Sequence, residues 1–440
     1  MSETGPRERS LLGRIGRNAG FLVSAKGAGA VFGLLYLSLA ARALGAADLG
    51  IVLLTHSVVV TIREIASFRS WQVLINYGAT YLKADDLPRF RHLLRLTSAL
   101  DVVGAVVGAA AGVVAILLFA SALGIEAEYQ RMALIYCVTS LIALRWTPIG
   151  LLRTFDRFDI LARQALVVPV MRTIGVAVGW YFDWPLLYFI GVWLVSDATA
   201  SLVLIALGWR ELNRRMPRLD FMGGERRKDH EGIWPFIVWA NLQSTVAAIA
   251  LNAPVILSGG LISTSAAAYV KVSQELANVL AKPAQLLGDV IYPEAVRIRA
   301  DGDVARLRAM LFRLTGTAAA IIGAVVLLGS LGAEQILGGL FGEEYREAAA
   351  VLTMFLIAGG VLALGLCCES TLFALNHPRA VFLCRAAATV ILVVGIAAMA
   401  GQRGAEGVGL AMLAYAISAS VLLWSSALRA LKQQEAAQAA

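Results

Sequence analysis

Residues 268–297 carry a stripe of polar side chains whose spacing fits one face of an α-helix. Consecutive members stand four or three positions apart, and the residues between them are mostly Val, Leu, Ala and Ile. This is the repeat of a helix with about 3.6 residues per turn. The stripe consists of Lys271, Glu275, Asn278, Lys282, Gln285 and Asp289. Ammonium, amide and carboxylate groups in this arrangement bind ions and polar ligands, provided that the face meets water or a polar partner.

The composition indicates that this stripe belongs to a chain built for a membrane. Of the 440 residues, 59% are hydrophobic and only 15% are charged, whereas soluble domains have about 45–50% apolar and about 25% charged residues. Apolar runs of roughly 20 residues, the length of a membrane-spanning helix, recur along the chain. We therefore expect an all-α integral membrane protein. The net charge of +8 is explained by loops that face anionic lipid, and it requires no nucleic acid.

Several kinds of site are not indicated by the sequence. The cysteines lie in or beside apolar runs without a CxxC pair or a His/Cys cluster, so we expect them to pack as small apolar residues. There is no phosphate-binding GxxxxGK[ST] loop. No arrangement of nucleophile, base and acid indicates an enzyme. The sequence thus predicts no catalytic residue, no metal site and no cofactor.

Twelve apolar ranges are long enough to cross a membrane, and the charges between them indicate their direction. The loops on the N-terminal side hold 24 of the 38 Lys and Arg residues, while the loops on the other side hold only four. Because loops rich in Lys and Arg stay in the cytoplasm, both termini are predicted to be cytoplasmic. The ranges are 19–40, 49–71, 93–119, 132–152, 164–182, 185–209, 232–257, 265–292, 310–332, 347–375, 380–400 and 407–427.

The ranges fall into two groups of six. We expect the following parts: a cytoplasmic N-terminal segment (1–18), an N-lobe (19–209), a basic cytoplasmic linker (210–231), a C-lobe (232–427) and a cytoplasmic tail (428–440). The triplet Arg-Leu-Thr occurs at 95–97 and again at 313–315 in similar surroundings, as expected for parallel repeats. Transporters with such repeats commonly bind their cargo between the lobes, near the membrane midplane.

Charges inside the predicted spans point to the same place. A charge at the centre of a lone membrane helix costs about 2.5–3.5 kcal/mol, so such residues usually face a wet interior. The polar stripe is therefore predicted to line a water-filled cavity between the lobes, together with His56, Arg63 and Glu64 of the second span. Lys26 of the first span is placed there too. Two alternatives stay open: a helix on the membrane surface for the stripe, and a side chain that extends to the interface for Lys26.

Three acids elsewhere in the spans are candidates for ion coupling, with a structural hydrogen bond to a neighbouring helix as the alternative for each. They are Asp101, Asp197 and Glu369. Arg145 and Arg172 are expected to extend to the interface, to pair with acids or to contact cargo.

Small residues in the third span indicate close helix packing. Gly104, Gly108 and Gly112 stand at every fourth position. This spacing lets two membrane helices approach closely. We expect this face to pack against a neighbouring helix rather than to bind a ligand.

The predicted cavity favours an anionic cargo. Lysines and arginines outnumber acids among its residues. Cationic groups inside a mostly apolar bundle suit a phosphate or diphosphate head. Since the chain has no ATPase motif, the energy for transport would come from an ion gradient, the membrane potential or metabolic pull.

Three segments resemble one known family. Behind the first span, "LAARALGAADLGIVLLTHSVV" (39–59) resembles a segment of bacterial polysaccharide-export flippases with a basic residue, Leu-Gly, small or acidic residues and Gly. "SFRSWQVLINYGATYLKADD" (67–86) is similar to the stretch that follows, and "PIGLLRTFDRFD" (148–159) to the short cytoplasmic turn after the fourth span. With twelve predicted spans, the chain resembles the polysaccharide (O-antigen/exopolysaccharide) translocases of the multidrug/oligosaccharidyl-lipid/polysaccharide flippase superfamily.

The resemblance implies a MATE-like flippase fold in the bacterial plasma (inner) membrane, with a cavity open alternately to each side. It implies a cargo of undecaprenyl-diphosphate-linked oligosaccharide, moved outward for surface polysaccharide such as lipopolysaccharide O-antigen. The head group would be held by Arg63, Lys26 and Lys271. Sugar hydroxyls would meet Glu275, Asn278 and Gln285. Membrane lipid and a downstream polymerase are the further partners that the family suggests.

Two alternative functions stay open. A multidrug exporter of the same fold, coupled to a cation, would need an acid-dominated cavity for cationic drugs. A membrane-embedded glycan polymerase or ligase would need a large outer loop with Arg and His. The longest predicted outer loop, 333–346, has Arg346 as its only base and no His.

Overall fold

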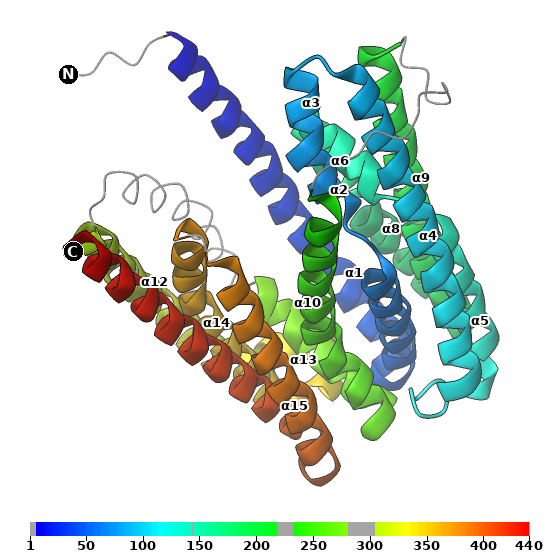
Figure 1. Ribbon diagram of the computed structural model, residues 1–440. Coiled ribbons are helices and arrows are strands. Elements are labelled where there is room, and N and C mark those ends of the chain that lie inside the picture. The colour runs from blue at the N-terminus through cyan, green and yellow to red at the C-terminus, as the bar shows by residue number, and fades with distance from the viewer. Residues whose placement is uncertain (1–5, 143, 218–231, 280–303, 376, 440) are drawn as a thin grey trace. The chain divides into compact units, whose positions relative to one another are not determined.

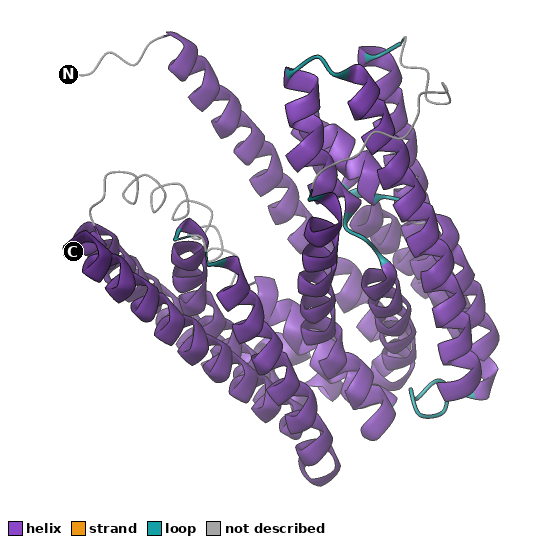
Figure 2. Ribbon diagram, viewed as in Figure 1, coloured by secondary structure: helices purple, strands orange, loops and turns teal. Residues whose placement is uncertain are grey.

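The computed structural model describes residues 6–142, 144–217, 232–279, 304–375 and 377–439. Every regular element in these ranges is a helix (Figure 2), which confirms the predicted all-α class. Among the described residues, seven helices are long and apolar enough to cross a membrane, or eight if one bent pair counts as a single span. The count of twelve spans and the sides of the termini stay predictions.

Helix α1 (Pro6–Ala66) contains the predicted range 19–40, most of the range 49–71, and a break between them. Gly45 interrupts the helix with φ 74° and ψ 178°, a backbone conformation that glycine adopts without the steric cost of a Cβ. The backbone N–H of Ala46, freed by the break, donates to Oε2 of Glu344 at 3.0 Å. A carboxylate from another helix thus caps the second half of α1.

Helix α15 (Pro378–Ala439) is a helical hairpin. Gly404 interrupts it with φ 56° and ψ −140°. Gly395 and Ala411 then face each other so closely that a Cβ on Gly395 would lie 3.2 Å from that of Ala411. Sγ of Cys384 and Oγ of Ser426 are 3.5 Å apart farther along the same hairpin. The two arms contain the predicted ranges 380–400 and 407–427, and they appear in orange and red in Figure 1.

The remaining helices are shorter. Between α1 and the gap at 218–231 they are α2 (Ser70–Val73), the π-helical η1 (Leu74–Gly78), α3 (Ala79–Lys83), α4 (Leu87–Phe119), α5 (Ala127–Thr139), the 3₁₀ turn η2 (Ser140–Ile142), α6 (Trp146–Thr154), α7 (Phe158–Gln164), α8 (Val167–Tyr181) and α9 (Leu186–Arg215). After the gap come α10 (Ile233–Leu261), the helical residues 264–279, α12 (Val304–Leu331), α13 (Ala333–Phe341), the 3₁₀ turn η3 (Glu343–Ala348) and α14 (Ala349–Ala374). The end of α12 and α13 form the bent pair, at 67°.

The chain forms two compact units. Unit 1 comprises Met1–Ala43, Val58–Ala120 and Glu126–Thr245, and unit 2 comprises Leu44–Ser57, Ser121–Ile125 and Val246–Ala440. The long helices α1 and α10 contribute residues to both units. The division into an N-lobe and a C-lobe of six spans each stays a prediction.

The cysteines pack as the sequence predicts. All four are free and buried. In unit 2, Cys367 and Cys368 of α14 and Cys384 of α15 belong to one apolar cluster with Leu372 and Leu423. They therefore contribute apolar contacts to the interior rather than redox or metal chemistry.

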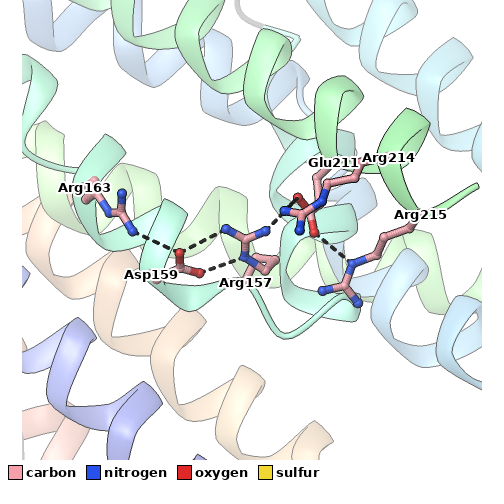
Figure 3. Close-up of polar contacts among 6 residues, drawn as sticks. All are labelled: Arg157, Asp159, Arg163, Glu211, Arg214 and Arg215. Atoms are coloured by element: carbon pink, nitrogen blue, oxygen red, sulfur yellow. Dashed lines mark hydrogen bonds and ion pairs between the residues drawn. The ribbon is translucent and has the colours of Figure 1, made fainter.

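A network of ion pairs fixes the turn between α6 and α7 to the end of α9 (Figure 3). Arg157 binds both oxygens of Asp159, at 2.9 and 3.0 Å, and Oε2 of Glu211 at 2.7 Å. Arg215 binds the other oxygen of Glu211 at 2.8 Å. Arg163 pairs with Asp159 at 3.1 Å from the opposite side. Because Asp159 and Glu211 are each shared between bases, the network locks the "TFDRFD" turn in place.

One glycine of α1 is required by a backbone contact inside unit 2. A Cβ on Gly50 would lie 1.9 Å from the carbonyl oxygen of Thr264. We expect Gly50→Ala to lower the free energy of unfolding by about 1–3 kcal/mol, since two backbone segments must separate. Gly33 of the same helix has open space around it, so Gly33→Ala is the matched control and is expected to be neutral or slightly stabilising. Thermal unfolding of the purified variants in detergent measures both, and an equal effect of the two substitutions would contradict this account of the packing.

Candidate functional site

Two helices of unit 1 are interrupted within ranges that the sequence predicts to cross the membrane. α1 ends at Ala66, and α2 begins at Ser70 after a left-handed residue, Arg69, with φ 47° and ψ 40°. The second interruption lies between η2 and α6, which begins at Trp146. Backbone groups freed by such breaks must find partners within the protein, because the hydrocarbon core of a bilayer offers none.

Asp101 of the unbroken helix α4 binds the first turns of both α2 and α6, the helices that begin after the two breaks. Its Oδ2 accepts the backbone N–H of Thr147 at 2.7 Å, and its Oδ1 accepts the hydroxyl of Ser70. The hydroxyls of Ser70 and Thr147 lie 3.4 Å apart. Asp101 is only 7% exposed. One buried carboxylate therefore holds the first turn of α2 against the first turn of α6.

Glu64, two residues before the end of α1, binds two arginines. Its Oε1 binds Arg145, and its Oε2 lies 2.9 Å from Nη2 of Arg69. Both guanidinium groups also stack on Trp146, at 4.3 Å for Arg69 and 4.8 Å for Arg145. Arginine over an indole ring adds cation–π attraction to the ion pairs. The cluster therefore orders three residues at the two breaks, Arg69, Arg145 and Trp146.

Arg63 is the base at this site that lacks an acid. Among the described residues, no carboxylate lies within 4.0 Å of its guanidinium, and its buried Nε has no hydrogen-bond partner. It lines a recess between the two breaks, whose residues are Arg63, Ser67, Phe68, Asp101, Gly104, Ala105, Arg145 and Trp146. Two arginines, Arg63 and Arg145, and one carboxylate, Asp101, line the recess, so it has an excess of positive charge that suits an anionic ligand.

The glycine stripe of α4 makes this recess possible. A Cβ on Gly104 would lie 2.8 Å from the carbonyl oxygen of Ala66, and one on Gly108 would lie 3.2 Å from Cβ of Ala66. A Cβ on Gly112 would lie 2.8 Å from Sγ of Cys137 on α5. The prediction that these glycines serve packing is confirmed. Their absent side chains bring α4, and with it Asp101, against the end of α1.

The polar stripe of the sequence lies in unit 2, where half of it is described. Nζ of Lys271 lies 2.9 Å from Oε1 of Glu275, four positions along the helix. Asn278 is half-buried. Lys282, Gln285 and Asp289 lie outside the described residues. Lys271 thus has an acid beside it, unlike Arg63, and the cavity between lobes stays a prediction.

The other two candidates for the cavity lie apart from the recess. Lys26 is exposed on α1. His56 is half-buried and belongs to unit 2, while Arg63, seven positions further along the same helix, belongs to unit 1. Neither is a lining residue of the recess in unit 1.

Of the three candidate coupling acids, two hold an arginine. Asp197 of α9 pairs with Arg172 of α8 at 2.9 Å and accepts the hydroxyl of Tyr136 at 2.6 Å. Glu369 of α14 pairs with Arg385 of α15 at 2.7 Å. Asp101 differs because its hydrogen-bond partners among the described residues, Ser70 and Thr147, are neutral. The expectation that Arg145 and Arg172 pair with acids is met in both cases.

Sequence reasoning missed four residues of the recess and its surroundings. Arg69, Ser70, Trp146 and Thr147 lie inside apparently continuous apolar ranges, so the breaks that expose them were not predicted. Two signals mark these breaks: the polar residues of "SFRS" in the second range, and Pro148 shortly after the start of α6. Proline is common in the first turn of a helix, where its missing N–H is not needed.

Comparisons with known proteins place the fold. No family model matches the chain. The chain is 29% identical to the inner membrane protein YghQ of Escherichia coli (strain K12) over 336 residues, which are 76% of this chain and 94% of that protein.

Solved structures give a similar fold at low sequence identity. An inward-facing multidrug resistance MATE transporter of the MOP superfamily matches with a TM-score of 0.74 at 12% identity, over 92% of this chain and 95% of that one. The lipid II flippase MurJ, in an inward closed conformation, matches with a TM-score of 0.70 at 10% identity, over 94% and 89%. These likenesses confirm the predicted MATE-like flippase fold.

The two neighbours Arg63 and Glu64 are expected to differ sharply in their effect on stability. Glu64→Ala leaves two partly buried arginines without their acid, so we expect the free energy of unfolding to fall by about 3 kcal/mol. Arg63→Ala removes a base without an acid partner among the described residues, and should change it by less than about 1 kcal/mol. Unfolding of both variants in detergent tests this, and an equal or larger loss for Arg63→Ala would contradict the assignment of charges.

Proposed function

We propose that this chain is a flippase that moves undecaprenyl-diphosphate-linked oligosaccharide across the bacterial inner membrane by alternating access. The observation that carries the proposal is Arg63, a base without an acid partner among the described residues, in a recess flanked by two helix breaks. A cation held inside a membrane at this cost is usually functional. A diphosphate supplies the missing negative charge, and a guanidinium binds two of its oxygens at once.

Two further findings support this proposal. The fold is similar to that of MurJ, a flippase of lipid II. Over 336 residues, 76% of its length, the chain is also similar in sequence to an inner membrane protein. The recess also argues against a multidrug exporter of the same fold, since its excess positive charge repels a cationic drug.

In the proposed complex, Arg63 contacts the diphosphate, and Lys26 and Lys271 contribute positive charge to the path of the head group. Glu275, Asn278 and Gln285 bind sugar hydroxyls, while the isoprenoid tail stays in membrane lipid. The flipped oligosaccharide then serves a polymerase that builds the surface polysaccharide. No cofactor and no catalytic residue are required, because no covalent bond is made or broken.

Deletion of the gene in its host tests the cargo. We expect carrier-linked oligosaccharide to accumulate inside the cell and surface polysaccharide to be lost, both measured by mass spectrometry of extracted lipids and glycans. Unchanged pools of both, together with a raised sensitivity to cationic drugs, would contradict the proposal and favour the exporter.

Complementation of the deletion strain tests the role of Arg63. Arg63→Ala should reduce export by roughly tenfold or more, because a hydrogen bond to a charged group is worth about 1.5–3 kcal/mol. Lys271→Ala should have a smaller effect, since Lys271 already pairs with Glu275. Arg89→Ala is the matched control, because Arg89 is 51% exposed, pairs locally with Asp86 and lies outside the recess. Full export by Arg63→Ala, at wild-type protein levels, would overturn the assignment of the head-group site.

A further inference from the structure

Among the described residues, Asp101 has an environment that three other acids inside the helices, Glu64, Asp197 and Glu369, do not share. Its two oxygens are engaged by the hydroxyl of Ser70 and the backbone N–H of Thr147. Among the described residues, no Lys or Arg nitrogen lies within 4.0 Å of it, whereas Glu64, Asp197 and Glu369 each bind at least one arginine.

This difference decides which acid binds a proton at the lower cost. Protonation of an acid that holds an arginine leaves a buried guanidinium without its partner, which is strongly unfavourable. Protonation of Asp101 breaks no ion pair and removes the cost of keeping a charge in a buried place. Arg63 and Arg145, which line the same recess, favour the ionised form. Burial and the nearby bases thus act on the ionisation of Asp101 in opposite directions.

A proton on Asp101 acts directly on both helix breaks. It forms an O–H bond to one carboxylate oxygen, adds one positive charge and breaks no covalent bond. The hydroxyl of Ser70 can turn round and accept a hydrogen bond from the new O–H, because a hydroxyl is both donor and acceptor. The backbone N–H of Thr147 cannot turn round, and a neutral acid is a weaker acceptor for it than a carboxylate.

We propose that Asp101 is a proton-binding site of this protein, and that its protonation loosens the restarts of α2 and α6. The inference rests on the contacts within unit 1 and not on the identity of the cargo. The charged groups that share the recess with Asp101 are Arg63 of α1 and Arg145 before α6. Glu64 of α1 pairs with Arg145 and with Arg69 beside this recess.

Infrared difference spectroscopy of the full chain in lipid nanodiscs tests the proton site directly. On acidification we expect a band of a protonated, buried carboxyl group in the wild type and its loss in Asp101→Asn. Asp197→Asn is the matched control and should keep the band, because Asp197 is held by Arg172. An unchanged band in Asp101→Asn would overturn the proposal.

Hydrogen exchange of the two breaks tests the consequence of protonation. After correction for the intrinsic effect of pH, the wild type should lose amide protection around residues 67–72 and 144–150 as the pH falls through the midpoint of the infrared band. Asp101→Asn mimics the neutral acid, so its protection in these segments should be low at every pH. A pH dependence in this variant equal to that of the wild type would contradict the proposed action.

Ser70→Ala keeps the test decisive if Asp101→Asn does not fold. It preserves the carboxyl group but removes one donor to its ionised form, which is worth about 1.5–3 kcal/mol. The midpoint of the infrared band should therefore rise by roughly one to two pH units. An unchanged or lower midpoint would overturn the proposal.

Discussion

The structure depends on one constraint: a membrane helix that stops midway must obtain partners for its backbone from neighbouring helices. Both breaks inside predicted membrane ranges meet this constraint with a polar side chain from another element. Asp101 accepts the N–H of Thr147, and Asn241 of α10 donates to the carbonyl of Ser67. The breaks thus explain why polar residues persist in helices that are otherwise apolar.

Pairing with acids distinguishes the arginines that stabilise the structure from Arg63, the arginine that we assign to cargo. Arg172 and Arg385 each pair with an acid, and Arg157 is held by Asp159 of α7 and Glu211 of α9. Arg69 and Arg145 share Glu64 and the face of Trp146. Arg63 is next to Glu64 in the chain, but it has no acid partner among the described residues. A charge that contributes so little to holding the structure together is better explained by a ligand.

Much of the fold follows from the sequence, because hydropathy and spacing act over whole helices. The predicted ranges 93–119, 380–400 and 407–427 lie within described helices, and the glycines of α4 pack as their spacing predicts. Arg63 and Glu64 were recognised because a charge in an apolar run is conspicuous. Lys271 and Glu275 meet because residues four apart on a helix are neighbours.

The breaks themselves could not be predicted from hydropathy, since an apolar run looks the same whether its helix continues or restarts. Their location depends on contacts between residues far apart in the chain, such as Asp101 with Thr147 and Glu64 with Arg145. For the same reason the sequence suggested three equivalent coupling acids, whereas the structure distinguishes Asp101 from Asp197 and Glu369 by their partners. Pair contacts of this kind are set by tertiary packing and carry no periodic signal.

The central claim, an anionic lipid head at Arg63, is tested most directly by native mass spectrometry of the protein extracted gently from its host membrane. The account predicts that the wild type carries a bound isoprenoid phosphate lipid, identified by its mass after dissociation, and that Arg63→Ala loses it while Arg89→Ala retains it. Equal amounts of this lipid on the wild type and Arg63→Ala, or only zwitterionic lipids on both, would contradict the account.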